Sequence, residues 1–132
     1  MKIYLSSIME ENYFGSGRLI GIATGRKPTN LTIDFKYEYL IPSQSLLDQY
    51  YSELKMNSPN AAENFINGFR TQLNDFVNKV IKYAAEFHKT PIELLPFQEG
   101  DTLVSWERKA NNNYRGLVAE ALEKLGYEVV SN

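Results

Sequence analysis

An arginine stands in an unusual position in the last third of the chain. The stretch "NNNYRGLVAEALEKLG" begins at Asn111 and is typical of a helix capped by asparagine, with Arg115 in its first turn. The first turn of a helix carries unpaired N–H groups and partial positive charge, so it favours acidic side chains. This turn contains none. An anion bound from outside would compensate both charges, and we therefore predict that Arg115 holds a phosphate group at the start of this helix.

The residues around Arg115 could complete such a site. We expect Asn112 to be the N-cap residue, because its side-chain oxygen can accept from an N–H group of the first turn. Tyr114 lies three residues before Leu117, and Arg115 lies three before Val118 and seven before Leu122, so both should lean toward the edge of a sheet. Trp106 and Arg108 end the preceding predicted strand and would add an aromatic face and another cation.

Two other stretches carry residues of the same kinds. In "ATGRKPTN", Arg26 and Lys27 follow a predicted strand, and Gly25 permits a tight turn with close approach of a ligand. The glycine spacing is not that of a phosphate-binding P-loop. Phe87 lies at the end of a long predicted helix, where its ring could lie against a base.

Each of these residues also has an ordinary structural explanation, which the sequence leaves open. Arg115 could form a salt bridge with Glu107 or Glu11. The basic turn after Gly25 could simply be solvated. Phe87 continues the apolar stripe of its helix, and the only histidine of the chain, His88, is as well explained as a capping residue as by acid–base chemistry.

Composition limits the classes of function. The length of 132 residues fits one domain, residues 1–132. The chain has no cysteine and one histidine, which excludes disulfides, thiol nucleophiles and Cys- or His-rich metal sites, and we expect neither a metal nor a cofactor. The net charge of −2 and the absence of a basic run argue against a polymeric nucleic-acid partner. No signal peptide or membrane-spanning run is apparent, so we expect no membrane partner and a cytoplasmic location.

The elements that must position these residues indicate the α/β (α+β) class. We predict a small mixed sheet with antiparallel N-terminal strands, a long helix, and a C-terminal strand–helix–strand unit with parallel strands. Ligands of open α/β sheets bind beyond the carboxyl ends of the strands, where the loop after Glu107 would lie. The expected strands are 2–8, 19–25, 31–40, 101–107 and 127–130, and the expected helices are 43–54, a long one within 57–90, a short one at 91–96, and one from 112 to the stop at Gly126.

Four short stretches, spread over most of the chain, stand out together: "MKIYLSSIME", "IATGRKP", "ELLPFQEGDTLVSWER" and "YRGLVAEALEKLGYEV". This combination resembles a small phage family, the first type of anti-Thoeris proteins. The resemblance implies a sponge that sequesters a cyclic ADP-ribose isomer, such as gcADPR made by TIR-domain enzymes, without cleaving it. Some members also bind cyclic oligonucleotides at separate sites made on assembly. The resemblance also implies a homodimer or higher homo-oligomer in the host cytoplasm, with Arg26 and Arg115 on phosphates and Phe87 against the base.

The segment around Arg115 also resembles a broader family of uncharacterised bacterial α/β proteins. That family has a Cys-His-Arg step where this chain has Asn-Tyr-Arg, and the loss of Cys and His weakens an enzymatic interpretation. We therefore favour a non-enzymatic module that binds a cyclic nucleotide signal and so inhibits bacterial anti-phage defence. The alternatives are an enzyme acting on nucleotides or nucleosides, with Glu107 or His88 as acid or base, and a protein-interaction module whose aromatic residues form an interface.

Overall fold

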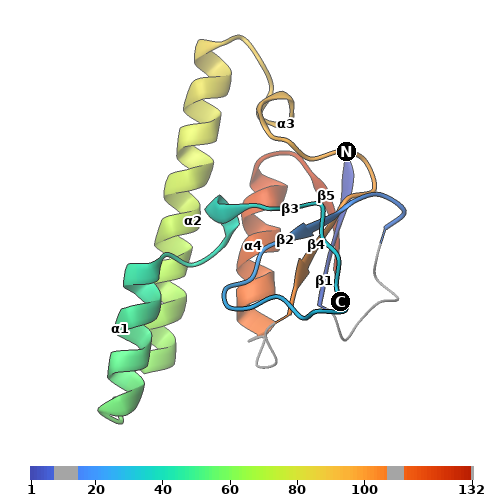
Figure 1. The fold of residues 1–132 in the computed structure, drawn as a ribbon. Helices are drawn as coiled ribbons and strands as arrows, with labels where there is room; N and C mark the ends of the chain where they lie inside the picture. Colours follow the sequence, from blue (N-terminus) through green and yellow to red (C-terminus); the bar gives the residue numbers. More distant parts are fainter. Residues whose placement is uncertain (8–14, 107–111, 132) are drawn as a thin grey trace.

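The structure, a computed structural model, describes residues 1–7, 15–106 and 112–131, with 112 and 113 described by their backbone alone. Its centre is a five-stranded sheet with the order β3-β2-β4-β1-β5 (Figure 1). Every pair of neighbouring strands is parallel. The strands are β1 Lys2–Ser7, β2 Leu19–Gly21, β3 Phe35–Lys36, β4 Thr102–Ser105 and β5 Glu128–Ser131.

The predicted α/β class is confirmed, but the predicted antiparallel N-terminal strands are wrong. β1 and β2 do not pair, because β4 lies between them and runs parallel to both. Gly15 and Gly17, which lie between the first two expected strands, pack against the segment before β4. The N–H of Gly17 donates to the carbonyl of Gly100 (3.0 Å), and the N–H of Gly15 donates to the Thr102 hydroxyl (2.7 Å).

Two other strand predictions need correction. The expected strand at 31–40 is reduced to β3, and a turn of 3₁₀ helix, η2 Glu38–Leu40, follows it. The strands that flank the last helix, β4 and β5, share one direction as predicted, but β1 is inserted between them and pairs with both. The strands therefore lie largely at the expected positions in the sequence. Because of long-range pairing, however, their neighbours in the sheet differ from those expected.

The first and third helices begin where the sequence predicts, whereas the last helix already includes Asn112 as its first residue, so the prediction that Asn112 is the N-cap residue is wrong by one position. The Ser43 hydroxyl caps the first helix by accepting from the N–H of Leu46 (3.2 Å). Thr90 and Glu93 form a reciprocal capping box at the short third helix. Gly126, with φ of 103°, follows the end of the last helix. The helices are α1 Gln44–Lys55, α2 Ala61–Glu86, α3 Pro91–Leu94 and α4 Asn112–Lys124.

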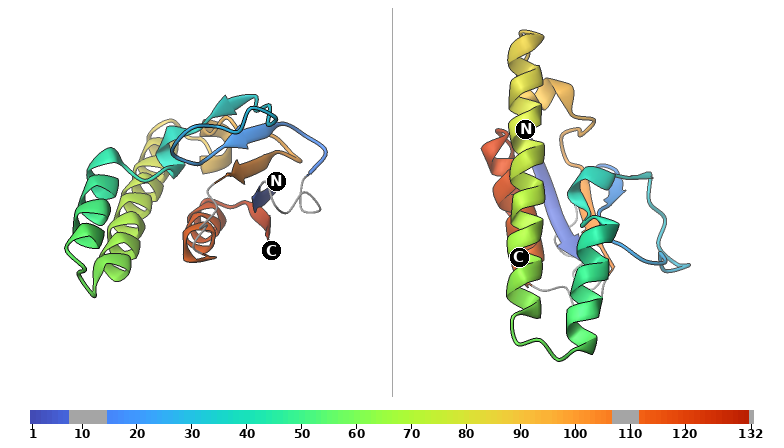
Figure 2. Two further views of the ribbon diagram at one scale, coloured as in Figure 1. Left: turned by 60° about the horizontal axis from the view of Figure 1, so that its bottom comes forward. Right: turned by 90° about the vertical axis from the view of Figure 1, so that its left-hand side faces the viewer.

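α2 and α4 cover one face of the sheet, and α1 packs along α2 (Figure 2). The main core lies between these helices and the sheet, and Leu103 of β4 belongs to it. The next residue, Val104, points to the other face, where it joins a small cluster with Ala23, Leu31 and Trp106. This second cluster lies beneath the connection between β2 and β3.

Candidate functional site

The carboxyl edge of the sheet collects polar residues from two neighbouring strands. Since β1 and β4 are parallel and in register, Ser7 at the end of β1 lies opposite Ser105 at the end of β4. Both serines are buried, with exposed fractions of 6% and 1%. The first turn of α4 lies at this same edge, toward the bottom of Figure 1. This is the place where the sequence analysis expected a ligand.

Tyr114 fixes the first turn of α4 against the sheet. Its hydroxyl donates to the carbonyl of Ile22, the residue after β2, at 2.7 Å. Its ring stacks on that of Phe69 in α2, with centroids 4.8 Å apart and an interplanar angle of 14°. Tyr114 is buried and positions α4 between β2 and α2. Its predicted contact with a ligand stays a prediction.

Arg115 is buried beside Tyr114, with an exposed fraction of 9%. The first turn of α4 contains no acidic residue, so the charge pattern that motivated the prediction is present in the structure. Glu11 and Glu107, the carboxylates considered as its partners, lie outside the described residues. The same holds for Arg108, and for the side chain of Asn112.

Two buried polar atoms at the end of β4 have no hydrogen-bond partner within the described part of the chain. They are the Ser105 hydroxyl oxygen and the indole nitrogen Nε1 of Trp106. Buried polar groups in folded proteins are nearly always paired, because leaving one unpaired costs about 1–3 kcal/mol. The indole N–H can only donate, and the hydroxyl can donate as well as accept. Both atoms could therefore serve a ligand that is rich in acceptor oxygens.

These two atoms approach the edge from opposite faces of β4. Ser105 lies on the same side as Leu103 and faces the helices, whereas Trp106 packs with Val104 in the cluster on the other face. The six-membered ring of Trp106 lies over Gly21, where a Cβ atom would come within 3.0 Å of it. A ligand that used both groups would have to extend across the end of β4.

The loop after β2 lies near this edge and contains the two predicted cations, Arg26 and Lys27. Gly25 has φ of 82°, the left-handed conformation that glycine adopts easily, and Arg26 beside it is exposed. Lys27 has a different role, because its ammonium donates to the carbonyls of Pro28 and Leu31 within its own loop. The sequence did not predict this structural role for Lys27.

Phe87 lies at the opposite end of the molecule from Arg115. It follows α2 as its C-cap residue and is 62% exposed. Figure 1 shows the C-terminal end of α2 at the top, whereas the first turn of α4 lies in the lower half. The structure therefore places Trp106, Tyr114 and Arg115 at one edge of the sheet, with Trp106 on the face opposite α4, and it does not bring Phe87 to them within one chain.

A cleft that the sequence analysis missed lies between α2 and residues 36–44. Its volume is ≈ 870 Å³, and it extends to Thr24 and Gly25 at the loop after β2. Tyr39 stacks on Phe76 in this cleft, with ring centroids 5.7 Å apart and an interplanar angle of 15°. Burial and, less strongly, the neighbouring Tyr39 raise the pKa of Tyr37 to about 12, so the Tyr37 hydroxyl stays protonated at neutral pH. The sequence places Tyr37 and Tyr39 in the expected strand at 31–40 and Phe76 in the long expected helix, and neither expectation indicates a cleft.

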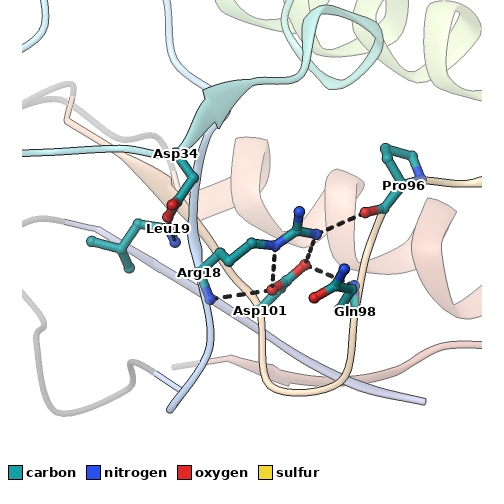
Figure 3. Close-up of polar contacts among 6 residues, drawn as sticks. All are labelled: Arg18, Leu19, Asp34, Pro96, Gln98 and Asp101. Carbon is teal, nitrogen blue, oxygen red and sulfur yellow. Dashed lines mark hydrogen bonds and ion pairs between the residues drawn. The ribbon is translucent and has the colours of Figure 1, made fainter.

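The amino edge of the sheet holds a charged cluster of a different kind (Figure 3). The Asp101 carboxylate accepts from Nε and Nη2 of Arg18 (3.2 and 2.7 Å) and from the N–H of Gln98 (2.7 Å). Arg18 also donates to the carbonyl of Pro96 (2.8 Å), and its guanidinium lies 5.1 Å from the centre of the Phe35 ring. This cluster uses its hydrogen-bonding groups internally, and we interpret it as a structural brace between β2 and β4.

No family model, curated protein or solved structure matches the chain in the comparisons with known proteins. Among the described residues, no group of three or more His, Cys, Asp or Glu side chains could hold a metal ion. None of the helices in the described ranges combines the length and the apolar character that crossing a membrane requires.

Proposed function

We propose that the protein binds a cyclic, phosphate-bearing nucleotide at the carboxyl edge of its sheet and sequesters it without cleavage. The observation that supports this proposal is that two buried polar atoms at the carboxyl edge, at Ser105 and Trp106, have no hydrogen-bond partner among the described residues. A phosphate group offers several acceptor oxygens and negative charge. Both suit a helix N-terminus that also carries a buried arginine, Arg115.

The identity of the ligand rests on the family resemblance. We propose a cyclic ADP-ribose isomer such as gcADPR, with Arg26 and Arg115 on its phosphates. Sequestration of such a signal in the cytoplasm of a host cell would inhibit anti-phage defence. A sponge stabilises the ground state of its ligand and gives nothing additional to a transition state, so the bound molecule would survive unchanged.

The position of His88 gives no support to the enzymatic alternative within one chain. This histidine follows the C-cap of α2, is exposed, and belongs to the end of the molecule opposite the first turn of α4. The other residue considered as acid or base, Glu107, lies outside the described residues. A binding role at the edge needs neither residue.

We also propose that the protein forms a homodimer or a higher homo-oligomer. Large apolar side chains are exposed toward the C-terminal end of α2, namely Ile81, Tyr83 and Phe87 (46%, 50% and 62%). In such an assembly, Phe87 of one chain could meet the carboxyl edge of another. A single chain does not achieve this arrangement.

The test of the binding proposal follows the fate of the ligand. Purified protein is incubated with gcADPR, freed of unbound ligand and heat-denatured, and the released material is analysed by chromatography. We expect intact gcADPR in amounts comparable to the protein. Release of an altered nucleotide, with growth of product when gcADPR is in excess, would establish the enzymatic alternative instead. Retention of no nucleotide would contradict the proposal.

A substitution tests whether the ligand binds at the carboxyl edge of the sheet. Arg115→Ala should weaken gcADPR binding by about 1.5–3 kcal/mol, since a charge-assisted hydrogen bond in a buried place is lost. Arg70→Ala, which removes an exposed arginine of α2, is the matched control and should bind like the unchanged protein. Arg115→Lys keeps the charge, so comparison with it distinguishes the loss of the charge from a general loss of folding. Unchanged affinity in Arg115→Ala, measured by calorimetry at a normal melting temperature, would refute the role of Arg115.

A further inference from the structure

The cleft beside α2 has the size of a small-molecule site and is braced by hydrogen bonds. Its volume of ≈ 870 Å³ falls within the roughly 300–1,000 Å³ of typical ligand pockets. α2 forms one wall, and the segment that contains η2 lies alongside it as the other (Figure 1). Gln72 of α2 joins the walls: its Oε1 accepts from the N–H of Ser43 (2.9 Å), and its Nε2 donates to the carbonyl of Ile41 (2.7 Å). The two walls are therefore held at a fixed separation before any ligand enters.

One side of the cleft presents an aromatic ring that is both exposed and held in place. Tyr39 is 64% exposed, although its ring stacks on Phe76. Tyr37 supports both rings, with centroids 5.6 Å from Tyr39 and 6.2 Å from Phe76. A tyrosine ring fixed by two aromatic neighbours, with much of its surface left to solvent, can stack on a planar aromatic group and loses little side-chain freedom in doing so.

The cleft offers two lysines to a ligand that carries a negative charge. The ammonium groups of Lys36 and Lys79 form no hydrogen bond or ion pair with any described residue. Glu38 and Asp75 line the same cleft, so the potential is not uniformly positive. A single anionic group can sit beside a lysine, whereas a highly charged polyphosphate would be repelled by the carboxylates.

We propose that this cleft is a second binding site, for a planar aromatic monoanion that stacks on Tyr39 and places its charge beside Lys36 and Lys79. The anion could be a carboxylate or a phosphodiester, since both offer acceptor oxygens to an ammonium group. The site is formed within one chain and adjoins the loop at the carboxyl edge only through Thr24 and Gly25. Neither its aromatic ring nor its two lysines belong to that edge.

The test uses pairs of probes that differ in charge. Indole-3-acetate is compared with its neutral counterpart indole-3-acetamide, and 3′,5′-cyclic AMP is compared with adenosine, by titration of the full chain followed by NMR. We expect at least one anion to bind at least tenfold more tightly than its neutral counterpart. Preference for indole-3-acetate would identify carboxylates as the ligand class, and preference for cyclic AMP would identify phosphodiesters. Equal binding within both pairs, or no binding at millimolar concentration, would overturn the proposal.

Matched variants locate the binding. Tyr39→Ala should weaken the preferred anion at least tenfold, whereas Tyr51→Ala, which removes an exposed tyrosine outside the cleft, should not. The double variant Lys36→Ala with Lys79→Ala should abolish the preference for the anion, and Lys55→Ala with Lys82→Ala should preserve it. Melting temperatures verify that all four variants fold. Unchanged binding in Tyr39→Ala, or dimerisation in solution that Tyr39→Ala abolishes, would show that the cleft has another occupant.

Discussion

At the scale of single residues, Tyr127 has a buried hydroxyl without a hydrogen-bond partner in the described part of the chain. Burial, followed by smaller effects of Tyr37 and Asp101, raises the pKa of Tyr127 to about 12. Because this hydroxyl is desolvated without compensation, Tyr127→Phe should leave the free energy of unfolding unchanged or raise it by up to about 1 kcal/mol. The edge-on ring contact with Phe97 is retained.

Urea denaturation at neutral pH measures this effect. Tyr114→Phe is the matched control, since it removes a buried hydroxyl that does donate, to the carbonyl of Ile22. It should cost about 1 kcal/mol. A cost of that size for Tyr127→Phe would mean that its hydroxyl has a partner after all.

Because of Asp101, the free energy of unfolding should decrease at acidic pH. Burial by itself raises the pKa of Asp101, but hydrogen bonds from the Arg18 side chain and from the N–H groups of Gln98 and Arg18 outweigh it, and the net pKa is lowered. In the unfolded chain this aspartate has an ordinary pKa of about 3.9. As the pH falls, the carboxylate is therefore protonated in the unfolded chain before it is protonated in the folded protein. The stabilising contribution is complete above that pKa and is lost as the pH falls through the lower pKa of the folded state.

Asp101→Asn should accordingly lower the free energy of unfolding by about 2 kcal/mol at pH 7. The difference from the unchanged protein should shrink below about pH 4. Urea denaturation over a series of pH values measures both effects, with Glu120→Gln, an exposed carboxylate of α4, as control. A difference that stays constant down to about pH 3 would contradict the assignment.

At the scale of elements, Gln72 fastens the start of α1 to α2. Gln72→Ala removes the hydrogen bonds to Ser43 and Ile41 and should lower the free energy of unfolding by about 1–2 kcal/mol. Gln49→Ala removes an exposed glutamine that bonds only within α1, to Glu53, and should change stability by less than about 0.5 kcal/mol. Equal effects of the two substitutions in urea denaturation would show that the brace contributes nothing.

The helices and the strand directions differ in how far the sequence could predict them. α2 was predictable, since its buried residues, Phe69, Leu73, Val77 and Val80 among them, repeat at helical spacing. Local chemistry at Ser43 and Gly126 indicated helix ends. Strand direction depends on which distant strands pair, and the glycines at 15 and 17 are as compatible with a crossover as with a hairpin. For that reason the parallel sheet could not be predicted.

The residues of the candidate site also differ in how far the sequence could predict their location. Trp106, Tyr114 and Arg115 flank a strand–helix junction, so their position at one edge of the sheet could be predicted, whereas the placement of Trp106 on the face opposite α4 could not. Phe87 could not be placed, because the 26 residues of α2 span roughly 39 Å and carry it to the other end. The cleft at Tyr39 and Phe76 depends on how α2 packs against η2, which no local pattern reveals.

At the scale of the whole molecule, we predict self-association. The exposed apolar side chains at Ile81, Tyr83 and Phe87 should bring chains together, so light scattering at micromolar concentration should give a mass above the 15.2 kDa of one chain. Phe87→Asp should return the mass to that of a monomer, whereas Tyr51→Asp, on α1, should not. A monomer at all concentrations would contradict this prediction.

The place of β1 in the sheet has a consequence for the synthesis of the protein. β1 is made first, yet its partners come last: Tyr4 pairs with Thr102, and Lys2 with Glu128. At about 5–20 residues per second, a ribosome needs several seconds to deliver those partners. Throughout that time both edges of β1, "KIYLSS", lack their native partner strands, while the α1–α2 pair can already form from neighbouring residues. The nascent chain is thus most prone to aggregate in the interval before β4 and β5 emerge.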